Sequence, residues 1–296
     1  FPYDQARNEQ VQAIEFALKT FLESDKKYCI VEAGTGVGKS AIGLTLGRLL
    51  NLKLPYSEDY AKGSYFLTTQ KVLQEQYEKD FGSPVGRMCS VNSSSNYQCS
   101  WHKKNDCRTS MQMLRTAKKG SGFFKNCTQK CNYKKSKQDF LNSDESVTNF
   151  PYFIMESTYS GKIKPRNLLV VDEAHNAEGV LSKFVEMGVS QYFCEKVVKC
   201  KWPDKITPVL FVKWIKSHYY PKLQSQILYF EQMMEKMGLS NKIKDLAAIS
   251  LKYDMLTSHS SKITTFLSDY SSDNWIMEKN QTEKRGYVKV VYRAID

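Results

Sequence analysis

The chain has 296 residues, of which 41% are hydrophobic and 25% charged, and this ordinary globular composition excludes disordered and low-complexity classes. No apolar run approaches the ~20 residues of a membrane span, and the first residues lack the pattern of a secretory signal, so an intracellular protein is expected. The formal charge of +12 is concentrated in residues 85–146, with 12 basic and 4 acidic side chains, and in residues 181–285, with 16 and 11. Such segments indicate a polyanionic partner, although a solvated basic surface gives the same pattern.

The first part of the chain alternates between helical and strand-like patterns. Apolar residues at helical spacing predict a helix over residues 8–23, and the apolar run at 28–31 predicts a short strand. A second helix is expected from residue 39 to about residue 50, then a strand over 64–68 and a helix over 71–81. Strands that alternate with helices form a parallel sheet with helices on its faces, so the sequence predicts an α/β fold.

The alternation stops over residues 85–146, which are rich in Ser, Asn, Lys and Cys and poor in aliphatic residues. Side chains of this kind hardly build a core by themselves, so a bound metal is expected to hold the segment together. Residues 167–171 form a continuous apolar run, which predicts a strand buried on both faces of a parallel sheet. Farther on, apolar-periodic stretches at 209–214, 227–237 and 243–256 predict a helical region.

A glycine-rich stretch over residues 32–40 lies between a predicted strand and a predicted helix, which is the context of a phosphate-binding loop. Glycines let backbone N–H groups close around phosphate oxygens, and the helix N-terminus adds its dipole. Lys39 is suited to the β- and γ-phosphates of a nucleotide, and the Ser40 hydroxyl to Mg²⁺. The strict P-loop pattern has glycine where this chain has Ala33, and a chance glycine turn before a helix is the alternative. The predicted phosphate-binding residues are Gly34, Thr35, Gly36, Val37, Gly38, Lys39 and Ser40.

Two carboxylates follow the apolar run at 167–171 directly. Side chains at the carboxyl end of a buried parallel strand face the ligand crevice of such a fold. Asp172 is therefore expected to hold Mg²⁺, and Glu173 to orient and deprotonate the attacking water. An ordinary acidic loop after a strand looks the same in isolation, but the phosphate loop upstream favours the catalytic interpretation.

Five of the eight cysteines fall within 43 residues, from Cys89 to Cys131. Four of them have the spacing C-x7-C-x19-C-x3-C, and four thiolates hold either Zn²⁺ or a 4Fe–4S cluster. The spacing does not match a common zinc finger. Cys89 is a rival first ligand, and Cys29, Cys194 and Cys200 are expected to be ordinary thiols. The candidate ligands are Cys99, Cys107, Cys127 and Cys131.

Residues 101–137 hold eleven Lys and Arg side chains against one acid, Asp106, with four aromatic residues interleaved. Basic groups for phosphates and aromatic faces for bases suit single-stranded nucleic acid, although the aromatics equally suit a small core around a metal. The candidate contacts with DNA in this segment are Lys103, Lys104 and Arg108.

Five blocks of the chain resemble, in the same order, those of superfamily 2 DEAH-type helicases, and among these the XPD/DinG-like iron–sulfur helicases. Residues 7–10 resemble the adenine-recognising R-x-x-Q element, and residues 32–40 resemble motif I, in which Ala33 is normal. Residues 67–77 resemble motif Ia, which in the family touches the DNA backbone. Residues 147–152 resemble the block after the cluster domain, and residues 172–175 match the DEAH box.

The resemblance implies a RecA-like P-loop NTPase lobe formed by residues 1–84, 147–180 and 286–296, the last being a strand that returns to the lobe. It implies a small iron–sulfur cluster domain at 85–146 and an all-α arch at 181–285. The implied cofactors are ATP, Mg²⁺ and a 4Fe–4S cluster, with Zn²⁺ as the alternative metal.

The implied activity is that of an ATP-dependent DNA helicase, a monomer that moves 5′→3′ on single-stranded DNA and separates forked or junction DNA. Arg7 and Gln10 would lie near adenine, and His175 would couple the nucleotide site to DNA. Thr69 and Gln70 would contact the DNA backbone.

The family's second RecA-like lobe would follow residue 296, so a nearly inactive fragment of a longer helicase is expected. Two alternatives remain open. One is a nucleic-acid-dependent ATPase or translocase without unwinding activity, and the other is a zinc-containing nucleic-acid-binding module with a vestigial phosphate loop.

Overall fold

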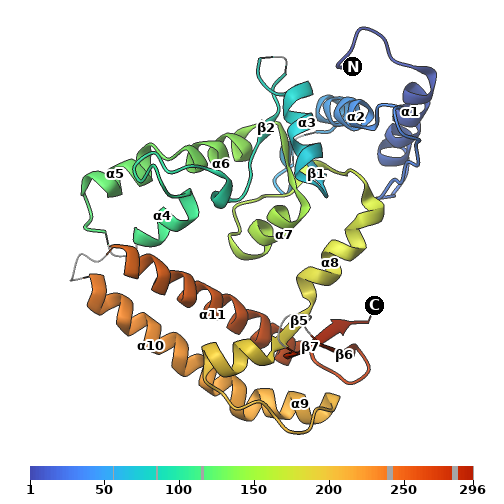
Figure 1. Ribbon diagram of the computed structural model, residues 1–296. Helices are drawn as coiled ribbons and strands as arrows, with labels where there is room; N and C mark the ends of the chain where they lie inside the picture. The colour runs from blue at the N-terminus through green and yellow to red at the C-terminus, as the bar shows by residue number, and fades with distance from the viewer. Residues whose placement is uncertain (56, 85, 115–116, 239–242, 282–285, 296) are drawn as a thin grey trace. The chain divides into compact units, whose positions relative to one another are not determined.

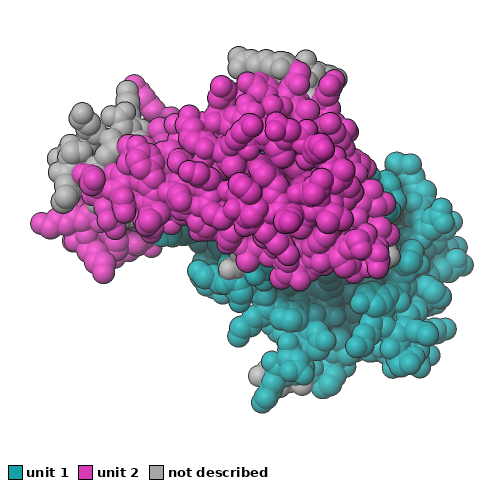
Figure 2. Space-filling model, turned by 90° about the horizontal axis from the view of Figure 1, so that it is seen from below, with its two compact units in different colours: residues 1–97, 130–180 teal, residues 98–129, 181–296 magenta. Residues whose placement is uncertain are grey.

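The computed structural model describes residues 1–55, 57–84, 86–114, 117–238, 243–281 and 286–295 (Figure 1). The chain forms two compact units, which Figure 2 distinguishes by colour. Unit 1 consists of residues 1–97 and 130–180, and unit 2 consists of residues 98–129 and 181–296. No helix in the described part of the chain is long and apolar enough to cross a bilayer.

Unit 1 is built on a four-stranded parallel sheet in the order β2-β3-β1-β4. The sheet is parallel because a helix follows most strands and carries the chain back to the same starting edge. The central strand β1 places Phe66 beside Val147 of β3 and Val170 of β4. The strands are β1 (Ala61–Thr68), β2 (Cys89–Ser90), β3 (Glu145–Asn149) and β4 (Arg166–Val171). The helices are α1 (Asn8–Leu22), α2 (Lys39–Lys53), α3 (Lys71–Phe81), α6 (Asn132–Asn142) and α7 (Phe150–Tyr159).

Helices cover both faces of this sheet because successive side chains of β1 point to opposite sides. Phe66 packs in one buried cluster with Leu44 of α2 and Tyr77 of α3. Its neighbour Tyr65 contacts the rings of Phe140 in α6 and Phe153 in α7. Burial of each such side chain stabilises the fold by about 1.5–3 kcal/mol. The expected α/β fold with a parallel sheet between helices is confirmed.

Unit 2 combines helices with a three-stranded antiparallel sheet in the order β5-β7-β6. In Figure 1 the long helices α10 and α11 run side by side. Its strands are β5 (Met187–Ser190), β6 (Trp275–Gln281) and β7 (Val288–Ala294), and α8 (Ala177–Val185) leads into it. Its helices are α4 (Cys107–Met113), α5 (Gly122–Gln129), α9 (Pro208–Trp214), α10 (Tyr220–Gly238) and α11 (Ile243–Asp269), with π-helical segments over Phe193–Val198 and Ile215–Tyr219.

Unit 2 has its own apolar core between the sheet and the helices. Phe211, Tyr219, Phe266 and Tyr292 are almost completely buried in it. The segment before α5 belongs to the same unit, because α4 packs on α11 and Gln112 donates a hydrogen bond to Asp254 at 3.1 Å.

The strand expected at residues 28–31 does not form. Tyr28 and Ile30 are 86% and 90% exposed, and the segment has no regular secondary structure. A four-residue strand depends on hydrogen bonds to a neighbouring strand. Residues 28–31 make no such pairing, and β4 is therefore an edge strand that pairs with β1 alone among the described strands. For the same reason β4 is not buried on both faces, and Leu169 remains 47% exposed.

The second half of the chain also differs from its expected arrangement. The return strand at 286–296 was expected in the parallel sheet, but β7 pairs with β5 and β6 instead. The region 181–285 is therefore not all-α, since it contributes β5 and β6 to this sheet. The expected cluster segment 85–146 is divided, with residues 98–129 in unit 2 and the rest in unit 1. The pairing of β5 with β7 joins residues about 100 positions apart, which local patterns do not reveal.

Candidate nucleotide site

The glycine-rich loop before α2 has the backbone that phosphate binding requires. Gly36 and Gly38 have φ angles of +81° and +86°, the left-handed region that favours glycine. A Cβ atom on Gly38 would also lie 2.5 Å from the side-chain nitrogen of Gln10. Gly38 is the N-cap of α2, which begins at Lys39, so the first N–H groups of the helix lie at the loop.

The predicted R-x-x-Q element lies against this loop. The Gln10 amide donates to the carbonyl oxygen of Val37 at 2.7 Å, and the Arg7 guanidinium donates to that of Gly36 at 3.0 Å. Gln10 also accepts a hydrogen bond from the Arg7 backbone at 2.9 Å and is only 5% exposed. Arg7 and Gln10 thus bind two carbonyl groups of the loop, so these carbonyl groups are directed toward α1. The contact of Arg7 and Gln10 with adenine stays a prediction.

Glu173 lies between the loop and the DEAH-box histidine. One of its carboxylate oxygens is 3.2 Å from the Lys39 ammonium nitrogen, and the other is 3.3 Å from Nδ1 of His175. Its backbone has φ +53° and ψ +47°, a conformation that costs a residue other than glycine about 1–3 kcal/mol. Such strain persists where surrounding contacts enforce it, and here it turns the carboxylate toward Lys39.

Asp172 is anchored at the carboxyl edge of the sheet. Its backbone N–H donates to the carbonyl oxygen of Leu67 at 2.9 Å, and its carboxylate accepts from the N–H of Glu173 at 3.0 Å. Burial raises the pKa of Asp172 above its ordinary value, while the nearby Tyr77 hydroxyl and the charge of Lys39 oppose this shift.

Tyr77 is a site residue that the sequence reasoning missed. Burial raises the pKa of its phenol, and Asp172 and Ser40, the two residues predicted to hold Mg²⁺, are close enough to influence this pKa. Its ring packs against Phe66 and Phe81, so the core fixes its position. Tyr77 ends the block that resembles motif Ia, and like Phe81 it is a buried aromatic residue of α3 in the cluster that includes Leu44 of α2. Its position on the apolar face of the predicted helix at 71–81 is the feature of the sequence from which its burial could have been predicted.

The site therefore gathers side chains from three separate segments. Lys39 and Ser40 open α2, Asp172 and Glu173 follow β4, and Tyr77 comes from α3. Together they provide a cradle of N–H groups and an ammonium group for phosphates, hydroxyl and carboxylate oxygens of the kind that Mg²⁺ prefers, and a second carboxylate for an attacking water.

The candidate cluster ligands are placed less favourably. Cys107 and Cys127 are 3% and 5% exposed in unit 2, Cys99 accepts a hydrogen bond from the His102 N–H at 3.3 Å, and Cys131 begins α6 in unit 1. Within the described ranges, no three His, Cys, Asp or Glu side chains are grouped so that they could hold a metal ion. None of the eight cysteines is in a disulfide.

The candidate DNA contacts lie in both units. The Thr69 hydroxyl, just after β1, is buried and has no hydrogen-bond partner among the described residues. Gln70 is the exposed N-cap of α3. Lys103, Lys104 and Arg108 are exposed in unit 2. Their contact with nucleic acid stays a prediction.

Comparison with protein families identifies a match over the first two thirds of the chain. The model of the family described as "Type III restriction enzyme, res subunit" matches residues 4–198, about two thirds of the chain, and this range includes the phosphate loop and the DEAH box. A comparison with curated proteins gave no match. The matched domain is a superfamily 2, helicase-type ATPase domain, which agrees with the parallel sheet and the gathered site residues. The chain thus belongs to the family of the type III restriction enzyme res subunit.

Proposed function

We propose that the chain binds ATP and Mg²⁺ at the glycine loop and hydrolyses ATP as part of a DNA helicase. The observation that carries this proposal is the convergence of Lys39 with Asp172 and Glu173. Lys39 is more than 130 residues away from both acids in the sequence. An ordinary glycine turn and an ordinary acidic loop have no reason to meet in this way. The family match supports the ATPase part of the proposal.

The ion pair between Lys39 and Glu173 suggests how binding prepares hydrolysis. A triphosphate in the loop would attract the Lys39 ammonium group more strongly than one carboxylate does, because it carries several negative charges. Glu173 would then be released beside the γ-phosphate, where it can orient and deprotonate a water molecule. Ser40 and Asp172 would hold Mg²⁺, which neutralises charge that develops on the phosphates.

The DNA-binding part of the proposal rests on position and charge. Thr69 and Gln70 follow β1 at the same sheet edge as Asp172, so a strand that contacts them would lie close to the nucleotide site. Lys103, Lys104 and Arg108 would contribute phosphate contacts. The helicase resemblance implies that the substrates are single-stranded and forked DNA. It also implies that the protein moves 5′→3′ and separates the strands. His175, beside Glu173, would link the DNA contacts to the catalytic carboxylate.

We also propose that Cys99, Cys107, Cys127 and Cys131 hold a 4Fe–4S cluster, with Zn²⁺ as the alternative. The four-thiol donor set supports the proposal, but the arrangement of the described side chains does not, so no mechanistic step depends on the cluster. Protein purified without oxygen is expected to be brown and to contain about four iron atoms per chain. A colourless protein with stoichiometric zinc would establish the alternative, and the absence of both metals would refute a metal site.

The catalytic role of Glu173 can be tested by single-turnover hydrolysis with protein in excess over ATP. Glu173→Gln is expected to bind ATP but to hydrolyse it at least about 100-fold more slowly, because the amide cannot accept the proton of water. Glu178→Gln is the control, since this exposed carboxylate lies nearby on α8. Equal rates in the two variants would remove Glu173 from the mechanism.

A further inference from the structure

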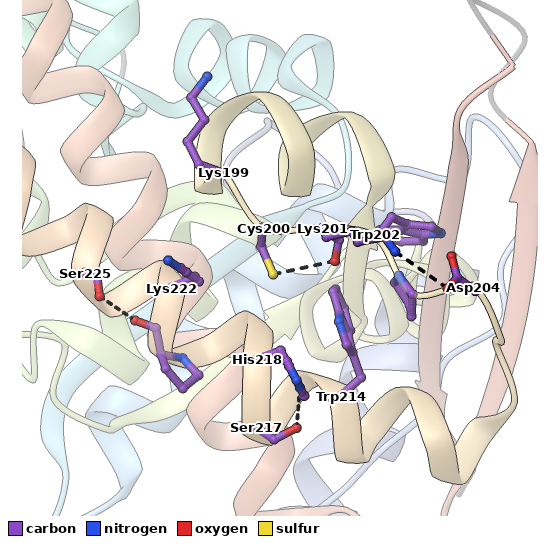
Figure 3. A pocket seen from close by; sticks show the side chains of 12 residues that line it. Lys199, Cys200, Lys201, Trp202, Asp204, Trp214, Ser217, His218, Lys222 and Ser225 are labelled. Atoms are coloured by element: carbon purple, nitrogen blue, oxygen red, sulfur yellow. Dashed lines mark hydrogen bonds and ion pairs between the residues drawn. The ribbon is translucent and has the colours of Figure 1, made fainter.

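Unit 2 contains a cavity of about 550 Å³ that the proposed ATP site does not use. It lies between the segment that follows the first π-helical turn and the helices α9 and α10 (Figure 3). In Figure 3 the side chains of Trp214, His218 and Lys222 lie along one wall, opposite the segment that carries Cys200 and Trp202. This volume is in the range of small-ligand pockets, and it is large enough for one nucleotide.

The charge of the cavity favours an anion. Lys199, Lys201 and Lys222 line it, against one acid, Asp204. Lys201 and Asp204 form a weak pair at 3.7 Å, in which both side chains are more than 80% exposed. Figure 3 shows the Lys199 side chain directed away from the other lining residues. No ion pair involves Lys222 within the described part of the chain, so Lys222 and the weakly paired Lys201 provide two ammonium groups for a ligand.

The apolar lining favours a planar aromatic group attached to that anion. The rings of Trp202 and Trp214 lie 5.7 Å apart at 67°. Trp202 is almost buried, whereas Trp214 keeps part of its surface open to the cavity. The exposed hydroxyl of Ser217, which hydrogen-bonds His218 at 2.6 Å, adds a polar contact. An aromatic base stacks on tryptophan, while its phosphate binds lysine.

We infer that this cavity is a second nucleotide-binding site, which takes one aromatic base with its phosphate. The nucleotide is either a unit of a single nucleic-acid strand or a free mononucleotide. This inference goes beyond the proposed function, because the cavity uses none of the residues of the phosphate loop and none of the proposed DNA contacts Lys103, Lys104 and Arg108.

The test is photo-crosslinking of a 5-iodouracil-containing oligo(dT) to chain that carries Lys39→Ala, which removes the contribution of the loop. The expected result is a crosslinked peptide that contains Trp214 or Trp202. The variant Lys201→Glu/Lys222→Glu should bind the oligonucleotide at least about tenfold more weakly, since two phosphate contacts become repulsive. The matched control Lys183→Glu/Lys196→Glu makes the same charge change at two exposed positions of unit 2 outside the cavity, and it should lose no more than about twofold.

Competition identifies the source of the nucleotide. If free thymidine monophosphate prevents the crosslink at millimolar concentration, the ligand is a mononucleotide, and if only the oligonucleotide does so, the ligand is a strand. The inference is overturned if crosslinks form only elsewhere in the chain, or if both double variants bind equally. It is also overturned if polyglutamate displaces the oligonucleotide at equal charge concentration, because charge alone would then explain the binding.

Discussion

At the scale of single residues, Tyr77 connects the core of unit 1 to the nucleotide site. Its ring belongs to the buried cluster on the sheet, and the pKa of its hydroxyl is influenced by Ser40 and Asp172. These two roles can be separated, because phenylalanine keeps the ring and removes the hydroxyl.

We therefore predict that Tyr77→Phe weakens binding of a magnesium–ATP analogue about tenfold and lowers the free energy of unfolding by only about 1 kcal/mol, the value of one hydrogen bond. Tyr77→Ala should cost about 3–5 kcal/mol, because it leaves a cavity. Calorimetric titration and urea denaturation measure the two effects. If Tyr77→Phe binds the nucleotide like the unchanged protein, the hydroxyl has no part in the site.

His259 provides a second prediction at this scale. It lies in α11, where it hydrogen-bonds the Tyr219 hydroxyl at 2.9 Å and contacts the ring of Phe193. Burial and the charge of Lys262 lower the pKa of His259 to about 4. Between this value and the ordinary 6.5, the unfolded chain binds a proton that the folded chain does not, so acid favours unfolding.

The stabilising effect of neutral His259 is thus complete above pH 6.5 and is lost as the pH falls toward 4. The loss amounts to about 3 kcal/mol at most. Urea denaturation measures the free energy of unfolding between pH 7 and pH 4. This free energy should fall more steeply in the unchanged protein than in His259→Asn, whose amide does not take up a proton. Parallel pH profiles would mean that the ring is accessible to protons in the folded protein.

At the scale of elements, the helices could be predicted from the sequence and the strand pairing could not. The expected helix at 71–81 coincides with α3, because its apolar spacing and the extended residue before it are local features. The run at 28–31 has a strand-like composition, but a strand also needs a neighbouring strand with which it forms hydrogen bonds. β7 has the same ambiguity: its apolar residues are typical of a strand, while its partners β5 and β6 are set by tertiary packing.

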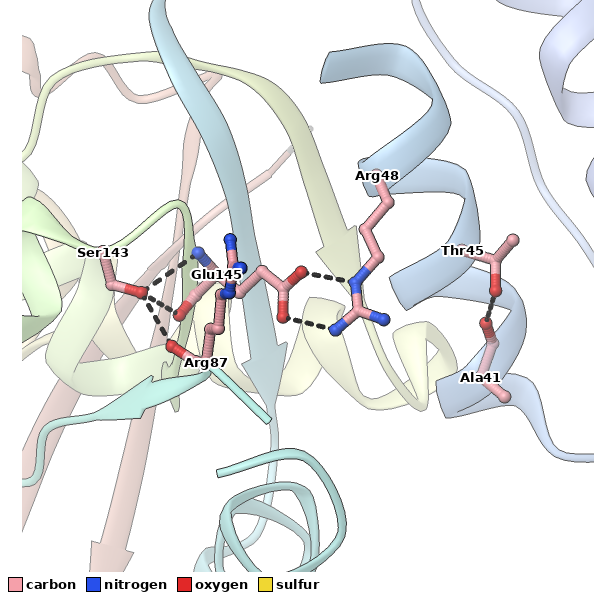
Figure 4. A network of polar contacts seen from close by, with 6 residues as sticks. All are labelled: Ala41, Thr45, Arg48, Arg87, Ser143 and Glu145. Carbon is pink, nitrogen blue, oxygen red and sulfur yellow. Dashed lines mark hydrogen bonds and ion pairs between the residues drawn. The ribbon is translucent and has the colours of Figure 1, made fainter. Parts of the chain in front are cut away.

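Elements are also joined by charge. Arg48 of α2 makes two parallel hydrogen bonds with Glu145 of β3, the longer at 3.0 Å (Figure 4). Glu145 is only 7% exposed, so its carboxylate depends on Arg48 for compensation. Arg48→Met is expected to destabilise unit 1 by about 2–3 kcal/mol, since it leaves a buried charge.

The exposed pair Arg293–Glu278 is the natural comparison for this measurement. Its two atoms are 2.9 Å apart, but the side chains are 50% and 38% exposed, so Glu278→Gln should cost less than about 1 kcal/mol. Urea denaturation of both variants tests the difference. Similar losses in both would show that the Arg48 pair has no special part in joining α2 to the sheet.

At the scale of the whole molecule, the site could be predicted where motif and fold agree. Lys39, Asp172 and Glu173 converge because a phosphate loop and the end of a parallel strand meet at one edge of any such sheet. The contacts of Arg7 and Gln10 with the loop carbonyls, and the role of Tyr77, were not predictable, because they depend on how α1 and α3 pack.

The net charge of +12 leads to the next prediction. Replacement of Lys103, Lys104 and Arg108 by Gln should weaken binding to single-stranded DNA at least about tenfold and reduce its dependence on salt, because three phosphate contacts are lost. Replacement of Lys53, Lys62 and Lys79 by Gln removes the same charge from unit 1 and should have a much smaller effect. Fluorescence anisotropy at several salt concentrations measures the affinity of both triple variants for single-stranded DNA. Equal losses of affinity would show that net charge alone explains the binding.

The central claim is that ATP binds between the glycine loop and the two acids after β4. Its most direct test is calorimetric titration of a nonhydrolysable ATP analogue with Mg²⁺ into the unchanged chain, Lys39→Ala and the control Lys19→Ala, whose lysine is exposed on α1. The account predicts one site per chain, lost in Lys39→Ala and retained in Lys19→Ala. Equal binding to all three proteins, or to none, would contradict it.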